Sequence, residues 1–407
     1  MNQNLHEFKN PFVLLLMLAV SFMTLSCASN NAEFRTTNDQ TPTEWANLGD
    51  DKSYQVSTAD ITKVEWWRSF EDPLLVNLIE EGLKSNYDIA RATNRIRQAQ
   101  EALNSVRVDK NPTLDTNIRT RKSTSSEESG LGQTSSIITT QFQTSWELDL
   151  FGKFKRNTEA AEANVQLEIA AMNGVKITLI STIAESYIAF RATTDEINLN
   201  QEAAEYLRNY VELAELETQV GLKSIDQVQK AKIQLASLET NIIEKKTRLK
   251  ETLLAIDLLI GAKPGETLNS LDHSIHSLKL PSTITISIPA NTILQRPDIQ
   301  EALRRLQVEA AKVGVAEAQR YPTFSLTGSI GLEALAINSI GNSGANFSTI
   351  QASLLAPIFN SGALKANVNA QVANREAALE IYRKSVANGL NETEQALLNL
   401  NSIKERV

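Results

Sequence analysis

The chain has 407 residues, which is enough for more than one compact core, so we expect two or more structural zones. Its formal net charge of −8, with no Lys/Arg-rich run, argues against a nucleic-acid partner. A single cysteine, Cys27, excludes an intrachain disulfide bond.

Residues 1–26 have the pattern of a signal peptide. An apolar run from Phe12 to Met23 is broken only by Ser21, and it is shorter than the roughly 20 residues that cross a bilayer as a helix. The run ends at TLSC, which resembles the lipobox of bacterial lipoproteins, although Leu25 stands one position closer to the cysteine than usual.

This resemblance implies a covalent lipid, diacylglycerol and N-acyl, on Cys27 as the first residue of the mature chain. Residues 27–65 are then predicted to be a lipid-anchored N-terminal extension. Ala28 and Ser29 follow the cysteine without an aspartate, which favours the outer membrane by analogy with bacterial lipoproteins. The alternative is an ordinary cleaved signal with an incidental cysteine.

Two long stretches of the chain repeat each other. Residues 86–114 align without a gap with residues 296–324, at a constant offset of 210 positions. We interpret the chain as a tandem duplication of one long unit. The first repeat is predicted to occupy residues 66–280 and the second residues 281–407.

Each repeat contains a predicted β-hairpin, at about residues 113–150 and about 323–358. Residues 138–152, ITTQFQTSWELDLFG, alternate between apolar and polar side chains, as a strand does when one face is apolar and the other polar. The strands are near the roughly 9–11 residues with which β-structure crosses a membrane. On periodicity alone, strands on the surface of a soluble domain remain an alternative.

The four strands of one chain are too few to form a closed β-structure by themselves. Four strands neither close a barrel nor bury a sandwich, and single-chain membrane barrels begin at about 8 strands, so copies of the chain would have to share one barrel. Three copies would supply 12 strands. The polar face would line its lumen, with Asp115, Asn117, Arg119, Gln141, Gln143 and Glu147 as the expected lumen-facing residues.

A long helical hairpin is predicted at residues 154–260. Residues 155–219, if they form one helix, would extend roughly 100 Å. Apolar residues recur by sevens, which indicates helices packed along one another. On the outgoing helix these are Ile183, Phe190, Ile197, Ala204 and Val211, and on the returning helix Val228, Leu235, Ile242, Leu249 and Ile256. The tip between them reads VGLKSID, with Gly221 as the helix breaker and Ser224 or Asp226 as the N-cap.

The second repeat has a predicted outgoing helix at residues 363–407, without a tip or a returning helix. The first repeat's returning helix ends near Gly261, so its counterpart would end about 64 residues beyond Val407. We expect the second repeat to be C-terminally incomplete, through truncation of the chain or, alternatively, through real loss of the last helix.

Catalytic and metal-binding motifs are absent from the sequence. His273 and His276 form an HxxH pair near Asp272, but a solvated loop explains them better when no further ligand is present. No phosphate-binding loop and no nucleophile elbow occurs. We therefore predict no enzyme activity, no metal site and no cofactor, and energy for any transport would come from a partner.

Several motifs at matching separations carry a resemblance that covers about residue 60 to the end of the chain. They are WWRSFEDPLLVNLI (66–79), WELDLFGK (146–153), LQRPDI (294–299), AEAQRYPTFSLTGSIG (316–331) and APIFNSG (356–362). The chain resembles the TolC/OprM family of bacterial outer-membrane efflux proteins, in its NodT-like lipoprotein branch.

The resemblance implies an α+β membrane protein that forms a homotrimer, with a 12-stranded β-barrel in the outer membrane of a Gram-negative bacterium and an α-helical barrel in the periplasm. It also implies a periplasmic adaptor and an inner-membrane pump as partners. Val220, Gly221 and Leu222 match the family's helix-tip motif, at which the adaptor docks. The family's gating aspartates would fall beyond Val407.

The sequence therefore predicts an outer-membrane channel subunit of a tripartite efflux pump that passively conducts drugs or other small molecules out of the periplasm. One alternative is a protein or peptide secretion duct of the same fold. Another is a non-conducting periplasmic coiled-coil lipoprotein, which would act as a spacer or scaffold.

Overall fold

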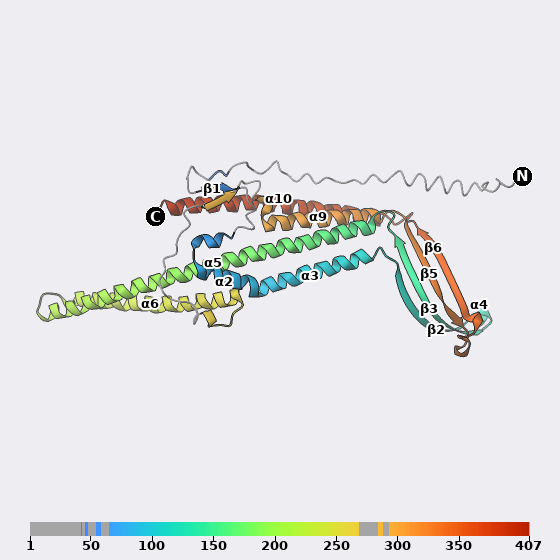
Figure 1. Ribbon diagram of the computed structural model, residues 1–407, viewed down its shortest axis with the longest axis horizontal. Coiled ribbons are helices and arrows are strands. Elements are labelled where there is room, and N and C mark those ends of the chain that lie inside the picture. Colours follow the sequence, from blue (N-terminus) through green and yellow to red (C-terminus); the bar gives the residue numbers. More distant parts are fainter. Residues whose placement is uncertain are drawn as a thin grey trace. The chain divides into compact units, whose positions relative to one another are not determined.

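The computed structural model describes residues 42, 45–47, 54–57, 65–267, 284–287 and 293–406. Cys27 and the HxxH pair His273 and His276 lie outside these residues. Residues 43–407 form one compact unit, so the two predicted repeats do not separate into two bodies. The reason is that α5 of the first repeat packs along α9 of the second, and β3 pairs with β5 (Figure 1).

The described elements follow the order expected for each repeat. In the first repeat they are η4 (Trp66–Phe70), α2 (Pro73–Ser85), α3 (Tyr87–Val108), β2 (Thr113–Thr124), α4 (Glu127–Gly130), β3 (Thr134–Leu148), α5 (Lys153–Gln219) and α6 (Ile225–Ile260). In the second they are α9 (Pro297–Ala318), β5 (Thr323–Ala334), η5 (Ile337–Ser339), η6 (Ser343–Ala345), β6 (Asn346–Leu355) and α10 (Ala363–Lys404).

Corresponding elements of the two repeats are equivalent in length and position. Helices α3 and α9 each have 22 residues and begin 210 residues apart, and β2 and β5 each have 12 residues with the same offset. Helices α5 and α10 also begin 210 residues apart, each after a glycine with positive φ. These glycines, Gly152 and Gly362, have φ of 79° and 83°, a conformation that glycine adopts without steric cost.

Two small features were not predicted. A parallel pair of short strands, β1 (Tyr54–Ser57) and β4 (Ile284–Ser287), joins the N-terminal extension to the segment before α9. The connection between β2 and β3 contains the short helix α4, whose first turn is capped by the Ser126 hydroxyl. Strand β6 ends at Leu355, slightly before the predicted boundary near residue 358, because Pro357 cannot donate to a strand ladder.

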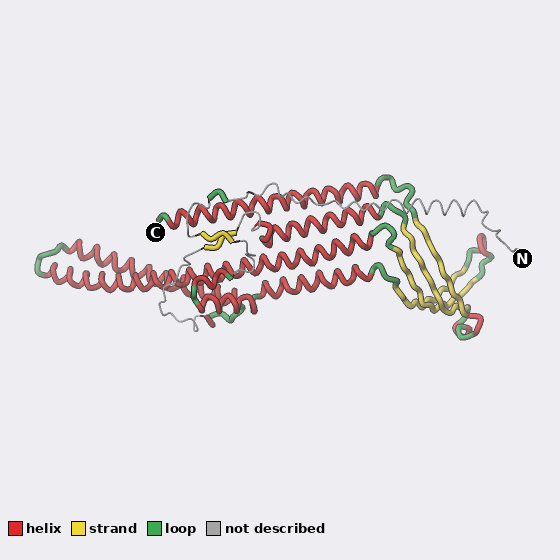
Figure 2. The backbone as a smooth tube through the Cα atoms, turned by 45° about the horizontal axis from the view of Figure 1, so that its top comes forward, coloured by secondary structure: helices red, strands yellow, loops and turns green. Residues whose placement is uncertain are grey.

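The four long strands form an antiparallel sheet in the order β2-β3-β5-β6 (Figure 2). Both connections within hairpins, which contain α4 and the turns η5 and η6, lie at one end of the sheet, away from the helices (Figure 1). The chain enters and leaves the sheet at the other end, where α3, α5, α9 and α10 meet it.

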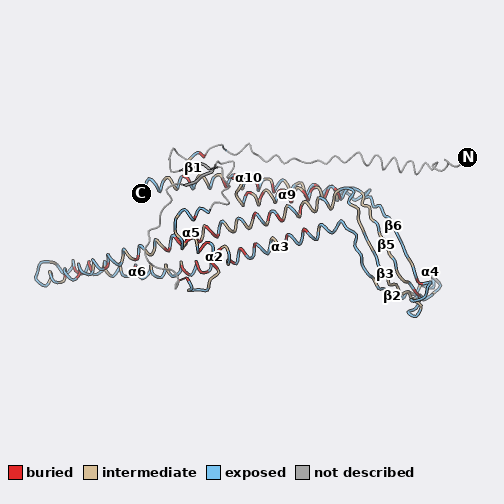
Figure 3. Tube along the Cα trace, viewed as in Figure 1, coloured by how far each residue is buried: buried red, intermediate tan, exposed pale blue. Residues whose placement is uncertain are grey.

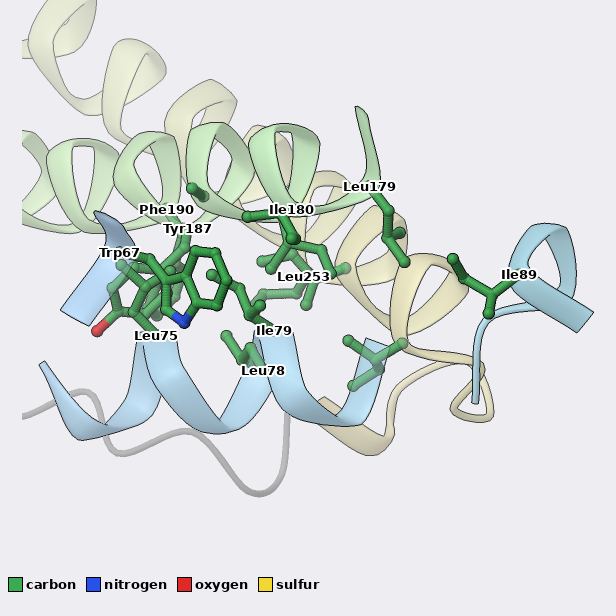
Figure 4. Packing of buried hydrophobic residues seen from close by; sticks show 14 residues of the cluster. Trp67, Leu75, Leu78, Ile79, Ile89, Leu179, Ile180, Tyr187, Phe190 and Leu253 are labelled. Carbon is green, nitrogen blue, oxygen red and sulfur yellow. The ribbon is translucent and has the colours of Figure 1, made fainter. Parts of the chain in front are cut away.

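The largest hydrophobic core lies where α2 packs against α5 and α6 (Figure 4). The residues predicted to recur by sevens on α5 are all buried: Ile183, Phe190, Ile197, Ala204 and Val211. On α6 the pattern buries Val228, Ile242 and Ile256 fully, while Leu235 and Leu249 are half-buried. The heptad pattern therefore marks the faces along which these helices pack.

Helix α5 is one unbroken helix of 67 residues, which corresponds to the roughly 100 Å expected from the sequence. Among the described residues, it is the one helix that is long and apolar enough by composition to cross a membrane. Because α5 packs against α2, α3, α6 and α9, part of its apolar surface already has protein partners, and core helices pass the same compositional test (Figure 3).

Candidate functional site

The polar residues that were expected to face a lumen lie on one face of the sheet. Asp115 is paired with Gln143 across β2 and β3, and Asn117 is paired with Gln141. Residues paired directly in an antiparallel ladder project to the same side. The Gln141 amide also donates to Gln143 Oε1 at 3.4 Å, so these side chains form a connected polar row.

The remaining two of these residues lie toward opposite ends of the same face. Arg119 is paired with Thr139, whose hydroxyl donates to Glu333 of β5 at 3.3 Å. Glu147 lies near the helix end of β3 and accepts a hydrogen bond from Lys153 Nζ at 2.6 Å. The polar face therefore extends from one hairpin into the other, and Glu147 also joins the sheet to the first turn of α5.

The opposite face of the sheet is apolar and uncovered. Leu114, Ile118, Phe142, Ile330 and Ile350 all project from it and are between 58% and 85% exposed. Exposed apolar surface on this scale marks a site that contacts another protein or lipid. The sheet thus has one polar and one apolar face, and neither is packed against the rest of the described chain (Figure 3).

The outer edges of the sheet are also open. Strands β2 and β6 each pair with one neighbour within the described residues. Unpaired backbone N–H and C=O groups along a strand edge favour pairing with another chain. Since strand direction alternates across the sheet, β6 of one copy would meet β2 of a second copy in the antiparallel sense.

The motif WELDLFGK forms the junction between sheet and helices. Trp146 donates its indole N–H to the Lys110 carbonyl at 2.8 Å, which holds the start of β2 beside the end of β3. The carboxylate of Asp149 accepts the backbone N–H groups of Phe154 and Lys155 at 3.2 and 2.9 Å, and so caps the first turn of α5.

A ring contact joins the two repeats at the same level. Phe151, just before α5, stacks on Tyr321, just before β5, with 4.8 Å between ring centroids and 12° between planes. Offset or stacked aromatic pairs contribute about 0.5–1.5 kcal/mol beyond the area that they bury. The motif therefore serves mainly to fix the angle at which helices and strands meet.

The motif LQRPDI fastens α9 to α10. Arg296 makes ion pairs with Asp298 at 2.9 Å and with Glu392 of α10 at 2.6 Å. Burial of Asp298 opposes its ionisation, but the hydrogen bonds and positive charge of Arg296 outweigh this and hold the pKa of Asp298 below its usual value. The motif has a structural role, in agreement with the position of Pro297 in the first turn of α9.

The tip of the α5–α6 hairpin exposes apolar side chains. Val220 and Leu222 are 71% and 76% exposed, and Gly221 between them has φ of 78°. The backbone N–H of Leu222 donates to the Glu217 carbonyl at 2.8 Å, which closes the end of α5. Of the two predicted N-caps, Ser224 occupies the position, and its backbone N–H donates to Gln227.

Lys223 was not identified from the sequence as a tip residue of interest, but it folds back along α5. Its Nζ lies 2.7 Å from Glu217 Oε2 and 4.7 Å from the centre of the Tyr210 ring. The carboxylate of Glu217 raises the pKa of Lys223. Paired in this way, Lys223 is half-buried, whereas the apolar side chains of Val220, Leu222 and Ile225 are exposed at the tip.

A metal centre has no support in the described part of the chain, where no group of three or more His, Cys, Asp or Glu side chains is placed to hold an ion. The two features that could carry a function are therefore the sheet, with its polar and apolar faces, and the exposed helical tip.

The chain is similar to known outer-membrane proteins along most of its length. The profile of the family described as "Outer membrane efflux protein" matches residues 78–262 and 288–407. Nodulation protein T of Rhizobium leguminosarum bv. trifolii is 29% identical over 347 residues, which cover 84% of this chain and 73% of the relative. The probable outer membrane lipoprotein SilC of Salmonella typhimurium is 25% identical over 399 residues, covering 97% and 84%.

A solved structure shows the same fold. The outer-membrane channel OprN superposes with a TM-score of 0.82 at 26% sequence identity, covering 90% of this chain and 82% of that channel. The mixture of long helices and strands predicted from the sequence is thus the fold of an outer-membrane channel.

Proposed function

This chain belongs to the outer membrane efflux protein family, and from that premise we propose that three copies assemble into the outer-membrane channel of a tripartite efflux pump. The channel conducts drugs or other small molecules passively from the periplasm to the exterior of a Gram-negative bacterium. A periplasmic adaptor and an inner-membrane pump select the cargo and supply the energy.

The observation that carries this proposal is the sheet, whose two faces and two edges are all open. A single copy leaves large apolar side chains such as Ile118 and Ile350 in water, at 75% and 85% exposure. Closing the sheets of several copies into a barrel places this face against lipid and the polar face around a water-filled lumen. The alternating strand directions permit such closure, and three copies supply 12 strands.

The proposal includes a lipid anchor on Cys27. The relative SilC is named a probable outer membrane lipoprotein, and the sequence TLSC before and at Cys27 has the matching pattern. Acylation would place the N-terminal end of the mature chain in the same membrane as the barrel.

The proposal also assigns the tip to the adaptor. Val220, Gly221 and Leu222 lie at the far end of a helical hairpin and expose apolar surface that nothing in the described chain covers. A small apolar tip of fixed conformation is suited to helix-to-helix docking, because little conformational entropy is lost on contact.

Neighbouring residues on opposite faces of β3 provide the test. Cysteine is introduced in place of Gln143 or Phe142 in a Cys27→Ser background, so that each protein holds a single thiol. The purified proteins are reconstituted in planar bilayers and treated with a charged, membrane-impermeant thiol reagent while conductance is recorded. Gln143→Cys should conduct and then be blocked, whereas Phe142→Cys should conduct and remain unaffected.

The matched pair distinguishes the alternatives. Equal labelling of both cysteines without any conductance would indicate strands on the surface of a water-soluble scaffold lipoprotein, and the channel proposal would be wrong. Conductance that is blocked through Phe142→Cys but not through Gln143→Cys would reverse the assignment of the two faces.

A further inference from the structure

Both repeats carry a cation at two equivalent positions where the helices meet the sheet. Lys110 lies between α3 and β2, and Arg320 lies 210 residues later, between α9 and β5. Lys155 is the third residue of α5, and Lys365, again 210 residues later, is the third residue of α10. We call these four residues the junction cations. Each strand of the sheet is connected to a helix at this end, so one junction cation lies beside each strand (Figure 1).

The two repeats share these charges although the charges around them differ. Within residues 107–110 and 147–156, every other charged residue corresponds to a residue that is neutral or of opposite sign in the second repeat. The pairs that differ are Arg107 with Glu317, Asp109 with Gln319, Glu147 with Pro357, Asp149 with Phe359, Lys153 with Ala363 and Arg156 with Ala366. The junction cations are therefore a common feature of both repeats rather than part of a generally charged segment.

The junction cations have no counter-ion within the described part of the chain. All four are exposed, and their side chains make no hydrogen bond or ion pair there. The nearby cations that the repeats do not share are paired, Arg107 with Glu162, Lys153 with Glu147 and Arg156 with Glu159, at 2.7, 2.6 and 2.7 Å. Two exposed acids, Asp109 and Glu317, lie at the same level, and the junction cations outnumber them. The charges that both repeats keep are thus the ones that the chain does not neutralise.

Helix electrostatics does not account for all four cations. Lys110 and Arg320 follow helix C-termini, where the helix dipole favours a positive charge. Lys155 and Lys365 lie in the first turns of their helices, where the dipole disfavours a positive charge. Because the same charge is kept at favourable and unfavourable helix ends, we look for its partner outside the chain.

The surface beside the junction cations is apolar and rich in aromatic residues. Trp146 lies four positions after Phe142 on β3, so it projects from the same apolar face, and its indole N–H donates to the Lys110 carbonyl at 2.8 Å. The backbone at Lys110 therefore lies beside the face that the proposed barrel turns toward lipid. The exposed apolar residues in the other connections are Leu150, Phe151, Tyr321, Ile358 and Phe359. Aromatic side chains in such a band are typical of the boundary between the hydrocarbon core and the headgroups.

Neighbouring junction cations can share an anion. Adjacent strands lie about 4.8 Å apart, and the Asn367 amide donates to Gln319 at 3.2 Å, which holds the segments next to Lys365 and Arg320 together. Like charges within a Debye length, about 8 Å at physiological ionic strength, repel one another unless an anion lies between them. Phosphate oxygens accept charge-assisted hydrogen bonds from both lysine and arginine.

We propose that the junction cations bind the phosphate groups of phospholipids in the leaflet that faces the periplasm, so that assembled copies are surrounded at the base of the barrel by a collar of bound headgroups. This collar fixes the depth of the channel in the membrane. The inference rests on the proposed function, because it takes the sheet to be the membrane-spanning part of the chain.

A fourfold variant tests the collar. It carries Lys110→Gln, Lys155→Gln, Arg320→Gln and Lys365→Gln. The matched control carries Lys246→Gln, Arg248→Gln, Lys250→Gln and Lys384→Gln, which remove equally exposed cations from α6 and from the second half of α10. Each protein is purified in detergent and titrated with dioleoyl-phosphatidylglycerol, and bound lipid is counted by native mass spectrometry.

The fourfold variant should bind this lipid at least about tenfold more weakly than the unaltered protein, because each cation near an anionic headgroup contributes roughly a factor of five. The control should bind it as the unaltered protein does. Equal affinity in the fourfold variant and the control would overturn the collar. If the fourfold variant does not assemble, the two half variants, Lys110→Gln with Lys155→Gln and Arg320→Gln with Lys365→Gln, should each bind more weakly, and unchanged affinity in both would overturn it.

Two further ligands test whether the lipid phosphate is what the cations recognise. Dioleoylglycerol, which has the same acyl chains without a phosphate, should bind the unaltered protein and the fourfold variant equally weakly. Binding of dioleoylglycerol as tight as that of the phospholipid would overturn the role of phosphate. Inorganic phosphate should not displace the phospholipid, and displacement would assign the site to free phosphate instead of a lipid.

Conductance in planar bilayers separates this proposal from the channel proposal. The unaltered protein, the fourfold variant and the control should show the same reversal potential in a KCl gradient. A fourfold variant that binds phospholipid normally but has a shifted reversal potential would place the cations in the lumen and overturn the collar. An unaltered protein that does not conduct would contradict the channel proposal, while the lipid titration would still decide whether these cations bind phospholipid.

Discussion

The contact between Asp72 and Tyr187 offers a test of how the first repeat is held together. Asp72 is the N-cap of α2, and its Oδ1 accepts the backbone N–H groups of Leu74 and Leu75 at 2.9 and 3.4 Å. Its Oδ2 accepts the hydroxyl of Tyr187, a fully buried residue of α5, at 2.6 Å. One carboxylate thus starts α2 and fastens it to the long helix.

Replacing Asp72 with alanine should therefore remove two contributions to the free energy that keeps α2 folded. Loss of an N-cap typically costs about 1 kcal/mol, within a range of roughly 0.5–2. A buried tyrosine hydroxyl that is left without a partner costs about 1–3 kcal/mol. Together they should lower the free energy of opening α2 by about 2–4 kcal/mol. Asp72→Asn should cost much less, because asparagine caps as well as aspartate and its amide can still bond to the hydroxyl.

Hydrogen exchange of the α2 amides measures this opening in the assembled protein. Since about 1.4 kcal/mol corresponds to a factor of ten, Asp72→Ala should accelerate exchange at Leu78 and Ile79 roughly 30- to 700-fold. Glu80→Ala, which removes only an exposed partner of Arg68, serves as the control and should have little effect. Equal acceleration by Asp72→Asn and Asp72→Ala would refute the reasoning, as would a change of less than threefold.

Three further predictions follow from contacts in other parts of the chain. Lys223→Met removes the ion pair with Glu217 and the cation–π contact with Tyr210, so hydrogen exchange of the Leu222 amide should become about two- to fivefold faster. Adaptor binding should also weaken. An unchanged exchange rate would show that the lysine does not fix the tip. Because the pKa of Asp298 is lowered in the folded protein, its carboxylate should make the unaltered protein more stable than Asp298→Asn above pH 4, and this difference should diminish as the pH falls through the lowered pKa. A difference in the free energy of unfolding that is equal at pH 6 and pH 3 would contradict this prediction. Gly331→Val should prevent assembly in detergent, because a Cβ there would lie 2.2 Å from the Thr140 carbonyl oxygen, whereas Gly344→Ala, with open space around it, should assemble normally.

Much of the fold could be predicted because its elements are long and strictly periodic. The heptad positions from Ile183 to Val211 are buried as expected, since a seven-residue repeat leaves one stripe available for packing. The alternation around Phe142 and Gln143 predicts two dissimilar faces for the same reason. Both predictions depend only on local geometry that the sequence encodes directly.

The contacts that escaped prediction join residues far apart in the chain. Glu394 and Asn47 are separated by 347 positions, and neither residue belongs to a motif with a spacing that signals contact. Lys223 could have been noticed, because a cation at a helix C-terminus is a recognised pattern, but its partners depend on how the tip turns back. The single compact unit formed by both repeats likewise depends on the packing of α5 against α9, which repeat boundaries do not reveal.

Native mass spectrometry of the membrane-extracted protein in detergent tests the central claim most directly. The account predicts a complex with the mass of three chains, each beginning at an acylated Cys27, because one copy leaves both edges and both faces of its sheet open. A stable monomer extracted under the same conditions would contradict the shared barrel, and with it the proposal that copies of this chain form the channel.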